Sequence, residues 1–417
     1  MSKSVRMVQA AVVALALLAG ACSQSVPQAA DEAIADGESA AAPATTAGVA
    51  EIEPPPDPDM VVDEALADLT VEEKVGQLLM PVLAGTSAEE VDAGDAALNR
   101  QISGLERPSD IVAAFHLGGV LYLENNIESA EQLRGLSSGL QTAAQAGGGP
   151  ELLIAVDQEG GRVNRITDQV TVFPSASDLA GNVDAVTEAS YVTGQQLQRQ
   201  GINVVLAPVA DVVLPGLPGF IGDRSFGDDP EMVADMVSGS VVGLQQSGVA
   251  AAVKHWPGHG ATDTDSHLSL PELKVDRAQW DQRERVPFDA AIANDVAIVV
   301  VGHLAVPGLD DSGTPATLST VIIDDLLRRE LGFDGVVMTD ALNMGAVGQF
   351  DAGDVSVDAI LAGADVLLVP PDLAASYEAL LAAAADGSLP ADRLDQSVRR
   401  VLMLKYKLSL LPEPGDR

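Results

Sequence analysis

The sequence predicts an α/β fold, and within that class a single-domain (β/α)8 barrel of the TIM type, from three observations. Eight apolar runs of strand length recur along the 417-residue chain. A longer stretch rich in alanine and leucine, with helical character, separates each run from the next. The runs are apolar on both faces, which is typical of buried parallel strands joined by crossover helices. Eight such units match a closed barrel better than an open, doubly wound sheet.

The predicted elements follow in a regular order from about residue 68. Thr70 and Glu73 have the spacing of a capping box, and a helix through Val75 and Leu79 is expected to follow. No Gly-x-Gly-x-x-Gly motif opens a helix after any strand, which argues against dinucleotide binding. The eight predicted strands are 78–82, 119–123, 152–156, 203–209, 250–253, 297–301, 335–338 and 365–369. Two further helices are predicted after the last strand, over 373–385 and 392–408.

The N-terminus has the features of an export signal. Lys3 and Arg6 precede an apolar run, 8–21, which ends in small residues and is short for a membrane span. The stretch Leu-Ala-Gly-Ala before Cys22 resembles the lipidation site of bacterial lipoproteins. Cys22 is the only cysteine, so no internal disulfide can form, and this favours a lipid anchor at Cys22. An ordinary cleaved signal is the alternative.

The segment after the signal is predicted to be a tether. Residues 22–60 are rich in Ala, Pro, Ser and acidic residues and cannot bury enough apolar surface to fold. The expected organisation is therefore a signal peptide (1–21), a lipidated cysteine with its tether (22–60) and the barrel with its C-terminal helices (61–417). We expect an exported monomer in the cell envelope, held on the membrane by the lipid anchor only.

The charge of the chain excludes one class of partner. Its 61 acidic and 23 basic residues give a formal net charge of −38. Because a phosphate backbone would be repelled by this charge, nucleic-acid binding is not expected.

Polar residues interrupt five of the eight runs at the same end. Catalytic residues of such barrels come from the C-terminal ends of strands. A single polar residue there could be a turn former or a helix N-cap, but five such ends together predict a functional site. The residues are Asp157 and Glu159, Asp211, Lys254 and His255, His303, and Asp340.

The loop KHWPGHGATDTDSH, residues 254–267, holds three of the five histidines. Asp265 precedes His267 by two residues, and on a turning loop its carboxylate can orient the imidazole and raise its basicity. Asp263 is an alternative partner. The chain has no HExxH motif, no cysteine cluster and no regular His-x-His pair, so no metal site is predicted.

Four stretches of the chain form a recognisable set: AVDQEGGRV (155–163), DRSFGDDP (223–230), KHWPGHGATDTDSH (254–267) and VVMTDAL (336–342). With them, residues from about 68 to 408 resemble the catalytic barrel of glycoside hydrolase family 3, in particular its single-domain β-N-acetylglucosaminidases. The resemblance implies a retaining exo-β-N-acetylglucosaminidase, without a cofactor, that removes terminal GlcNAc from cell-wall (peptidoglycan) fragments or related glycans.

The resemblance also implies roles for individual residues. Asp340 would be the nucleophile, and His267 would be the general acid/base with Asp265 as its partner. The alternative for Asp340 is an N-cap of a helix that starts near Ala341. The residues that match sugar-binding positions of the family are Asp157, Arg224, Lys254 and His255.

Several residues of the predicted site are harder to assign. Lys254 and His255 are adjacent, so both can reach the sugar only if the strand has ended or bulged there. Arg162 and Asp211 could bind the sugar or form structural salt bridges. His259 is expected to shape its turn and support the loop. A supporting role is likewise expected for the histidine that ends the sixth run, His303.

Three other interpretations remain open. A family 3 β-glucosidase typically has a further domain that contributes the acid/base and lacks the Asp-x-His loop. A phosphorylase is possible in chemical terms, because a histidine is neutral where a carboxylate would repel phosphate. A non-catalytic, sugar-binding surface lipoprotein would be expected to have lost Asp340 or the pair Asp265 and His267, and all three residues are present.

Overall fold

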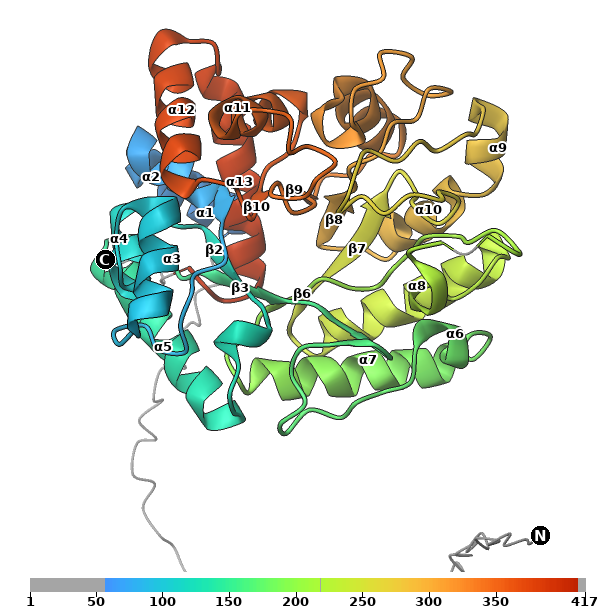
Figure 1. Cartoon of the computed structure of the whole chain (residues 1–417), viewed down its shortest axis with the longest axis horizontal. Helices are drawn as coiled ribbons and strands as arrows, with labels where there is room; N and C mark the ends of the chain where they lie inside the picture. Colours follow the sequence, from blue (N-terminus) through green and yellow to red (C-terminus); the bar gives the residue numbers. More distant parts are fainter. Residues whose placement is uncertain (1–56, 218, 412–417) are drawn as a thin grey trace, which may run out of the picture. The chain divides into compact units, whose positions relative to one another are not determined.

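The computed structural model describes residues 57–217 and 219–411. In this part of the chain, eight parallel strands form a barrel with helices around it (Figure 1). Each strand coincides with or overlaps one of the eight apolar runs, so the predicted (β/α)8 barrel is confirmed. The strands are β1 (Leu79–Met80), β2 (Gly119–Tyr122), β3 (Leu153–Val156), β6 (Val204–Val205), β7 (Ala250–Trp256), β8 (Ile298–Val301), β9 (Val336–Thr339) and β10 (Leu367–Leu368).

Two short strands close the barrel between the edges of a six-stranded sheet. The strands β2, β3, β6, β7, β8 and β9 are neighbours in that order, and every pairing is parallel. β1 pairs with β10, also in parallel. The amide of Thr339 donates to the carbonyl of Val366 over 2.9 Å and joins β9 to β10. The amide of Leu121 donates to the carbonyl of Pro81 over 3.0 Å and joins β2 to the residue after β1.

Helices alternate with the strands and cover the outside of the barrel (Figure 1). A hairpin of two antiparallel strands, β4 (Gln158–Gly160) and β5 (Val163–Asn164), directly follows β3. Both helices predicted after the last strand are confirmed, as α12 and α13. The helices from α2 onward are α2 (Val71–Gln77), α3 (Ala93–Ser103), α4 (Pro108–Ala114), α5 (Ala130–Ala146), α6 (Ala176–Leu179), α7 (Val183–Gln198), α8 (Pro230–Gln246), α9 (Arg277–Gln282), α10 (Arg285–Ala293), a helix with π-type hydrogen bonds (Val321–Glu330), α11 (Ala352–Ala362), α12 (Leu373–Asp386) and α13 (Ala391–Lys407).

The strands bury side chains on both faces and so separate two apolar layers. In β7, Ala250 and Ala252 belong to the inner cluster, whereas Ala251 and Val253 belong to the cluster beneath the helices. This alternation follows from the two-residue period of a strand. Helix α13 contributes Val401 and Leu404 to the inner cluster and therefore fills the barrel from its N-terminal end.

The first predicted helix exists but is shorter than expected. The side chain of Thr70 accepts a hydrogen bond from the amide of Glu73, and Glu73 accepts one from the amide of Thr70, which confirms the capping box. The prediction that this helix continues through Leu79 is wrong, because α2 ends at Gln77. Leu79 instead belongs to strand β1, where it pairs with Leu367 of β10 and forms part of the barrel wall.

The first helix of the described residues begins earlier than predicted. Helix α1 (Pro58–Asp68) starts inside the segment assigned to the tether, and the expectation of a start near Asp68 is wrong. The side chain of Asp57 caps the helix, and Pro58 occupies its first position, where a missing N–H costs nothing. Val61 and Val62 are buried where α1 packs on α13. This tertiary contact explains why composition alone misplaced the boundary.

The signal peptide, Cys22 and residues 22–56 of the predicted tether lie outside the described residues. In the part of the chain that the structure describes, no helix combines the length and the apolar character needed to span a membrane.

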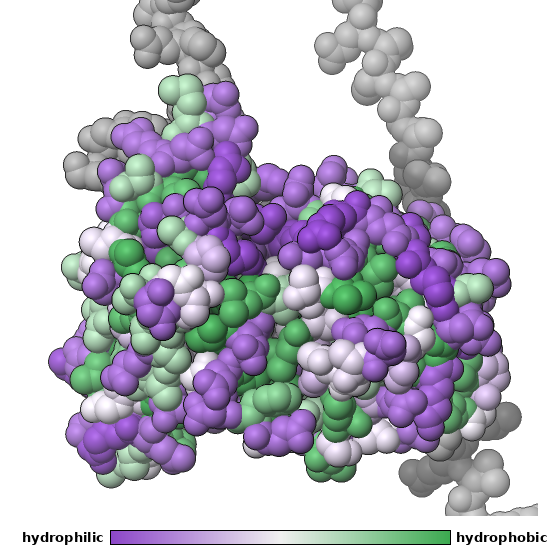
Figure 2. Space-filling view, turned by 90° about the horizontal axis from the view of Figure 1, so that it is seen from above, coloured by the Kyte–Doolittle hydropathy of each residue, from purple (hydrophilic) through white to green (hydrophobic). Residues whose placement is uncertain are grey.

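The face of the molecule drawn in Figure 2 does not single out a docking patch. Hydrophilic and hydrophobic residues are interspersed over it. Single exposed apolar side chains such as Leu98 and Leu268 occur at separate places in the sequence, and isolated residues of this kind are ordinary on protein surfaces. The expectation of a monomer stays a prediction.

A buried carboxylate joins α13 to the strands that close the barrel. Asp365, which is fully buried, accepts hydrogen bonds from the amide of Val337 in β9 over 2.9 Å and from the hydroxyl of Ser397 in α13 over 2.7 Å. It also pairs with Arg328 of the π-type helix and, over 3.3 Å, with Arg400 of α13. One side chain thus ties β9 to two of the outer helices.

We predict that Asp365→Ala lowers the free energy of unfolding by about 3–5 kcal/mol, because it leaves several buried cationic and polar groups without their acceptor. Urea unfolding of the purified protein measures this change. The matched control is Asp395→Ala in α13. It removes the half-exposed partner of Lys74 and should cost less than about 1 kcal/mol. Equal losses in the two variants would contradict the prediction.

Candidate active site

A cavity of about 380 Å³ lies at the C-terminal ends of the strands. Six of the seven predicted catalytic and sugar-binding residues line it; Asp265 does not. The structure thus brings together two side chains from the end of β7, one residue each from just after β3 and β9, and two from connecting segments. The six residues are Asp157, Arg224, Lys254, His255, His267 and Asp340.

Asp340 directly follows β9 and faces the cavity. Its Oδ1 accepts a hydrogen bond from the amide of Ala341 over 2.8 Å. Burial raises the pKa of Asp340, but the nearby His255 and His303 outweigh this effect and hold it below its ordinary value. The carboxylate is therefore ionised at neutral pH, as a nucleophile must be.

The N-cap interpretation of Asp340 is wrong, because no helix begins in the described stretch that directly follows it. The next helix, α11, starts only at Ala352 and is capped by Asp351. His303 supports the turn after Asp340 instead: its Nε2 lies 3.0 Å from the carbonyl oxygen of Ala341. His303 is buried and is not among the residues that line the cavity, which agrees with the supporting role expected for it.

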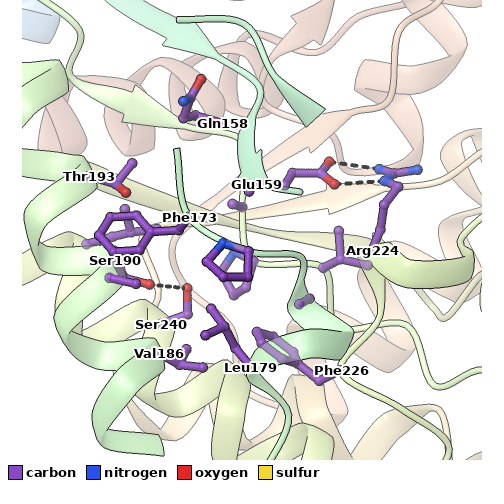
Figure 3. Close-up of a pocket in the computed structure, with 18 of the residues that line it drawn as sticks. Gln158, Glu159, Phe173, Leu179, Val186, Ser190, Thr193, Arg224, Phe226 and Ser240 are labelled. Carbon is purple, nitrogen blue, oxygen red and sulfur yellow. Dashed lines mark hydrogen bonds and ion pairs between the residues drawn. The ribbon is translucent and has the colours of Figure 1, made fainter. Parts of the chain in front are cut away.

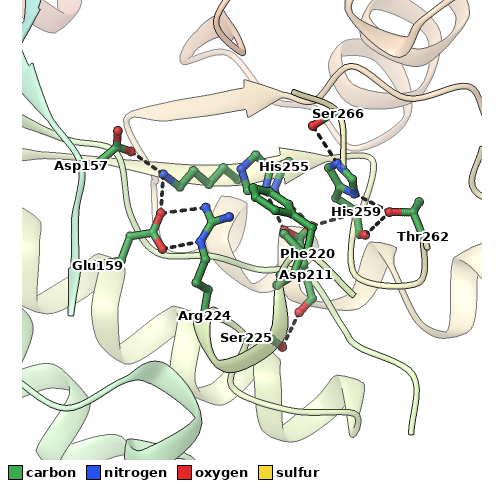
Figure 4. Close-up of polar contacts among 12 residues, drawn as sticks. Asp157, Glu159, Asp211, Phe220, Arg224, Ser225, His255, His259, Thr262 and Ser266 are labelled. Carbon is green, nitrogen blue, oxygen red and sulfur yellow. Dashed lines mark hydrogen bonds and ion pairs between the residues drawn. The ribbon is translucent and has the colours of Figure 1, made fainter. Parts of the chain in front are cut away.

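An unbroken row of opposite charges forms one wall of the cavity (Figure 4). Lys254 Nζ lies 2.7 Å from an oxygen of Asp157 and 2.7 Å from an oxygen of Glu159. The two carboxylate oxygens of Glu159 also accept hydrogen bonds from Nε and Nη2 of Arg224, over 2.7 and 2.8 Å. Since each charge has a partner, these side chains are held in fixed positions despite their burial.

Glu159 is the residue of this row for which the sequence predicted no particular role. Burial raises its pKa, but Lys254 and Arg224 outweigh burial and lower the pKa to about 2. Its place two residues after Asp157, just past the end of β3, was a usable signal. It joins the two cations that the family resemblance assigned to the sugar.

Glu159 and Arg224 also separate the cavity from a second, smaller void of about 50 Å³ (Figure 3). Helices α7 and α8 line this void, and Ser190 of α7 donates to Ser240 of α8 over 2.9 Å. The ion pair is therefore a partition between the cavity and the helical layer.

Adjacent residues Lys254 and His255 both face the cavity because the strand is irregular there. The pairing register of β7 with β8 shifts between Lys254 and Trp256. A bulge of this kind redirects side chains that would otherwise alternate. The condition stated from the sequence, that the strand ends or bulges at this point, is met.

Asp211 orients the imidazole of His255 (Figure 4). It is fully buried, and its Oδ2 lies 2.7 Å from His255 Nδ1. Burial raises the pKa of Asp211, but His255 and His259 outweigh it and lower the pKa. An ionised carboxylate only accepts, so Nδ1 of His255 must donate and Nε2 is left for the cavity. Of the two roles left open for Asp211, the structure supports the salt bridge.

The Asp-x-His pair on the loop after β7 is formed by Asp265 and His267. Oδ1 of Asp265 lies 2.8 Å from His267 Nδ1 and 2.9 Å from the His267 amide nitrogen. The side chain of Asp263 instead accepts from the hydroxyl of Thr264 over 3.0 Å. Burial raises the pKa of Asp265, but its hydrogen bonds with His267 lower it overall. An ionised Asp265 only accepts, so Nδ1 of His267 donates to it and Nε2 is left for the cavity.

Two sets of contacts hold the loop that carries His267. The amide of Gly345, in the turn after Asp340, donates to the carbonyl of His267 over 3.1 Å. A side chain on Gly345 would meet that carbonyl oxygen at 2.7 Å, so the close approach requires glycine. On the loop's far side, the ring of Phe220 contacts the edge of the His267 ring, with centroids 5.2 Å apart.

His259 supports the loop from below (Figure 4). Its Nδ1 lies 2.6 Å from the hydroxyl of Thr262, which itself donates to the His259 carbonyl. Its Nε2 lies 3.0 Å from the hydroxyl of Ser266, the residue between Asp265 and His267. Burial lowers the pKa of His259, which favours the neutral ring, and the two hydroxyl groups can serve such a ring as one acceptor and one donor.

The described residues contain no group of three or more histidine, aspartate or glutamate side chains arranged to hold a metal ion.

A carboxylate and a carboxylate-oriented imidazole that meet at the C-terminal end of a barrel provide a nucleophile and a proton donor, as the reaction of barrel glycoside hydrolases requires. The chain belongs to glycosyl hydrolase family 3, since the model of the family's N-terminal domain matches residues 70–404. The family resemblance seen in the sequence is thereby confirmed.

Curated relatives and solved structures agree with this assignment. The chain is 34% identical to Beta-hexosaminidase A of Pseudoalteromonas piscicida, over 72% of this chain and 55% of that protein. It is 36% identical to Beta-hexosaminidase LpqI of Mycobacterium tuberculosis, over 73% of this chain and 78% of that protein. The chain thus spans only about half of the first relative.

The structure is similar to two solved enzymes of this type. A glycoside hydrolase family 3 beta-N-acetylglucosaminidase from Paenibacillus sp. superposes with a TM-score of 0.76 at 39% identity, over 84% of this chain and 65% of that one. The Beta-N-acetylhexosaminidase from Beutenbergia cavernae superposes with a TM-score of 0.72 at 31% identity, over 82% of this chain and 99% of that one.

We predict that His259→Ala weakens the acid/base role that the family resemblance implies for His267, because the loop that carries His267 loses its support. With aryl glycosides whose leaving groups need a proton, kcat/KM should fall about 10- to 100-fold. With leaving groups of low pKa, which depart unprotonated, the loss should be much smaller. A series of leaving groups therefore measures the effect.

The matched control is His116→Ala, at the opposite end of the barrel between α4 and β2, which should leave the leaving-group dependence of wild type in place. An equal fall of kcat/KM across the whole series for His259→Ala would show a general loss of folding instead.

Proposed function

We propose that this chain is a retaining exo-β-N-acetylglucosaminidase that removes terminal β-linked GlcNAc from glycans, with peptidoglycan fragments as the natural substrates. The observation that carries the proposal is that Asp340 and the imidazole oriented by Asp265 face one cavity at the C-terminal end of the barrel. The activity is further supported by the similarity to curated relatives called Beta-hexosaminidase and to the beta-N-acetylglucosaminidase from Paenibacillus sp..

The first half of the reaction forms a covalent intermediate. The carboxylate of Asp340 attacks the anomeric carbon while His267, as the imidazolium, gives its Nε2 proton to the departing oxygen. Asp265 stabilises the positive ring through Nδ1 and holds Nε2 toward the leaving group.

The second half releases the sugar with its configuration retained. The now neutral Nε2 of His267 takes a proton from water, and the resulting hydroxide-like oxygen attacks the anomeric carbon and displaces Asp340. The imidazolium is restored, so one residue serves as acid and then as base.

The charged row beside the nucleophile provides the groups for sugar binding. Lys254 and Arg224 can donate to hydroxyl oxygens, Asp157 can accept from hydroxyl hydrogens, and Nε2 of His255 offers a further hydrogen-bonding position. Their mutual ion pairs hold them before substrate arrives, which reduces the entropy lost on binding.

We predict that Asp340→Ala lowers turnover of aryl β-GlcNAc by a factor on the order of 10⁴, because the covalent step is lost. Added azide should restore turnover and give the inverted glycosyl azide, since the small anion can occupy the space of the missing carboxylate. Asp263→Ala, which removes a nearby carboxylate without a partner role at His267, is the matched control. Equal activity of wild type and Asp340→Ala would contradict the assignment of the nucleophile.

The same assay tests the substrate and the acceptor. Wild type should prefer aryl β-GlcNAc over aryl β-glucoside, and added phosphate should not change the product. A preference for the glucoside would favour the β-glucosidase interpretation. Formation of GlcNAc 1-phosphate would favour the phosphorylase.

We also propose that the protein is exported to the cell envelope and anchored to a membrane by a lipid on Cys22. The support is the basic and apolar N-terminal sequence with its small residues before the single cysteine. Cys22→Ala should move the full-length protein from the membrane fraction to the soluble fraction, whereas Ser23→Ala should not. Unchanged fractionation of Cys22→Ala would rule out the anchor.

A further inference from the structure

One aromatic ring of the cavity contacts both the sugar-binding row and the acid/base loop. Phe220 lines the cavity, and the guanidinium carbon of Arg224 lies 5.1 Å from the centroid of its ring. The ring centroids of His267 and His259 lie 5.2 and 6.0 Å from the same centroid. Figure 4 shows Phe220 between Arg224 and His259. Phe220 takes no part in the proposed steps, yet its ring joins the groups proposed to bind the sugar to the proposed proton donor.

The backbone of Phe220 is fixed independently of the acid/base loop. A single turn of 3-10 helix, Gly222–Arg224, follows it and brings the arginine side chain back over the ring. The sequence left the role of Arg162 open between sugar binding and a structural salt bridge. In the structure Arg162 pairs with Asp223 over 2.7 Å, and its Nη2 donates to the carbonyl of Phe220 over 2.8 Å. These contacts set the place from which the aromatic ring extends.

Arg224 gives the ring of Phe220 a rigid support. Its guanidinium group donates two hydrogen bonds to Glu159, and both side chains are buried. A cation over the face of an aromatic ring is attracted by the electron-rich face, and this attraction is stronger where water is excluded. The ring is therefore held by the same charged row that is proposed to bind the sugar.

The imidazole of His267 needs a support besides Asp265, because the pair is exposed. The side chain of His267 is 57% exposed and that of Asp265 is 33% exposed, so water competes for their hydrogen bond. The torsion that turns a histidine ring about its bond to Cβ has a broad energy minimum, and one hydrogen bond at Nδ1 leaves the direction of Nε2 loosely defined. Phe220 meets the ring at an interplanar angle of 63°, a favourable edge-to-face arrangement that limits this rotation.

We propose that Phe220 is a positioning residue for the proton transfer. Its ring relates the imidazole of His267 to the fixed position of Arg224, so that Nε2 is aligned with the glycosidic oxygen of the sugar that the charged row holds. The inference rests on the proposed function and adds a residue to it. An orienting contact of this kind lowers the barrier only where the leaving group takes a proton in the transition state.

The test is a series of aryl β-GlcNAc substrates whose leaving groups differ in pKa. Phe220→Leu keeps an apolar side chain but removes the ring. With phenol as the leaving group, kcat/KM should fall about three- to tenfold, because the proton donor is no longer aligned. With dinitrophenol, which departs unprotonated, the fall should be less than about twofold. Phe220→Tyr keeps the ring and should retain the leaving-group dependence of wild type.

Two controls isolate the contact. Phe115→Leu removes a ring that meets Tyr377 edge-on, also with centroids 5.2 Å apart, and neither residue lines the cavity, so it should behave as wild type. In a His267→Ala background, Phe220→Leu should cause no further loss that depends on the leaving group. Hydrolysis of the dinitrophenyl glycoside by each variant reports the proposed activity by itself, so failure of that activity is distinguished from failure of the inference.

Three results would overturn the inference. If Phe220→Leu and wild type depend on the leaving group to the same degree, the ring does not position the proton donor. If Phe220→Leu lowers kcat/KM by one factor across the whole series, the ring only maintains the shape of the cavity. If Phe220→Leu causes the same leaving-group-dependent loss with and without His267, the ring acts through another group.

Discussion

The closure of the barrel depends on how the short strands β1 and β10 are held between the edges of the six-stranded sheet. β1 and β10 are two residues long and cannot close a cylinder by their own hydrogen bonds. Asp365, just before β10, accepts from β9 and from α13 and pairs with arginines of two helices. The far end of β9 carries Asp340. The carboxylate at the N-terminal end of the barrel therefore keeps in place the strand that presents the proposed nucleophile at the other end.

The active site repeats one device with different partners: a carboxylate fixes a cation or an imidazole before substrate arrives. Asp211 orients His255, Asp265 orients His267, and Glu159 holds Lys254 and Arg224 together. In each case burial raises the pKa of the carboxyl group, and the partner that it contacts outweighs burial and lowers the pKa. Fixed dipoles and charges of this kind need no reorganisation when charge develops in the transition state.

Much of the fold could be predicted because a barrel of this type produces a strong sequence pattern. Strands buried on both faces appear as apolar runs. Polar residues at the same end of five of the eight runs indicated where the site would lie. What was missed depended on contacts between distant residues. Helix α1 is stabilised by packing on α13, which composition cannot reveal, and the end of α2 is set by the pairing of Leu79 with Leu367.

Within the site, chain geometry could not choose between near neighbours. Asp263 and Asp265 are both close enough in sequence to reach His267, and only the turn of the folded loop selects Asp265. Likewise, a register shift in β7 lets Lys254 and His255 face one cavity, and no residue of this strand indicates that shift in the sequence. Glu159 needed the positions of Lys254 and Arg224 before its place between them could be recognised.

The backbone hydrogen bond between Gly345 and His267 links the segment that follows the proposed nucleophile to the loop that carries the proposed proton donor. The loop that carries the proposed proton donor comes from β7 but rests on the turn that follows the proposed nucleophile on β9. Nucleophile and proton donor therefore form one mechanical unit, because the loop can leave its docked position only by parting from that turn. A new loop grafted after β7 would have to bring a matching turn after β9, so these two segments are expected to change together in any redesign of the site.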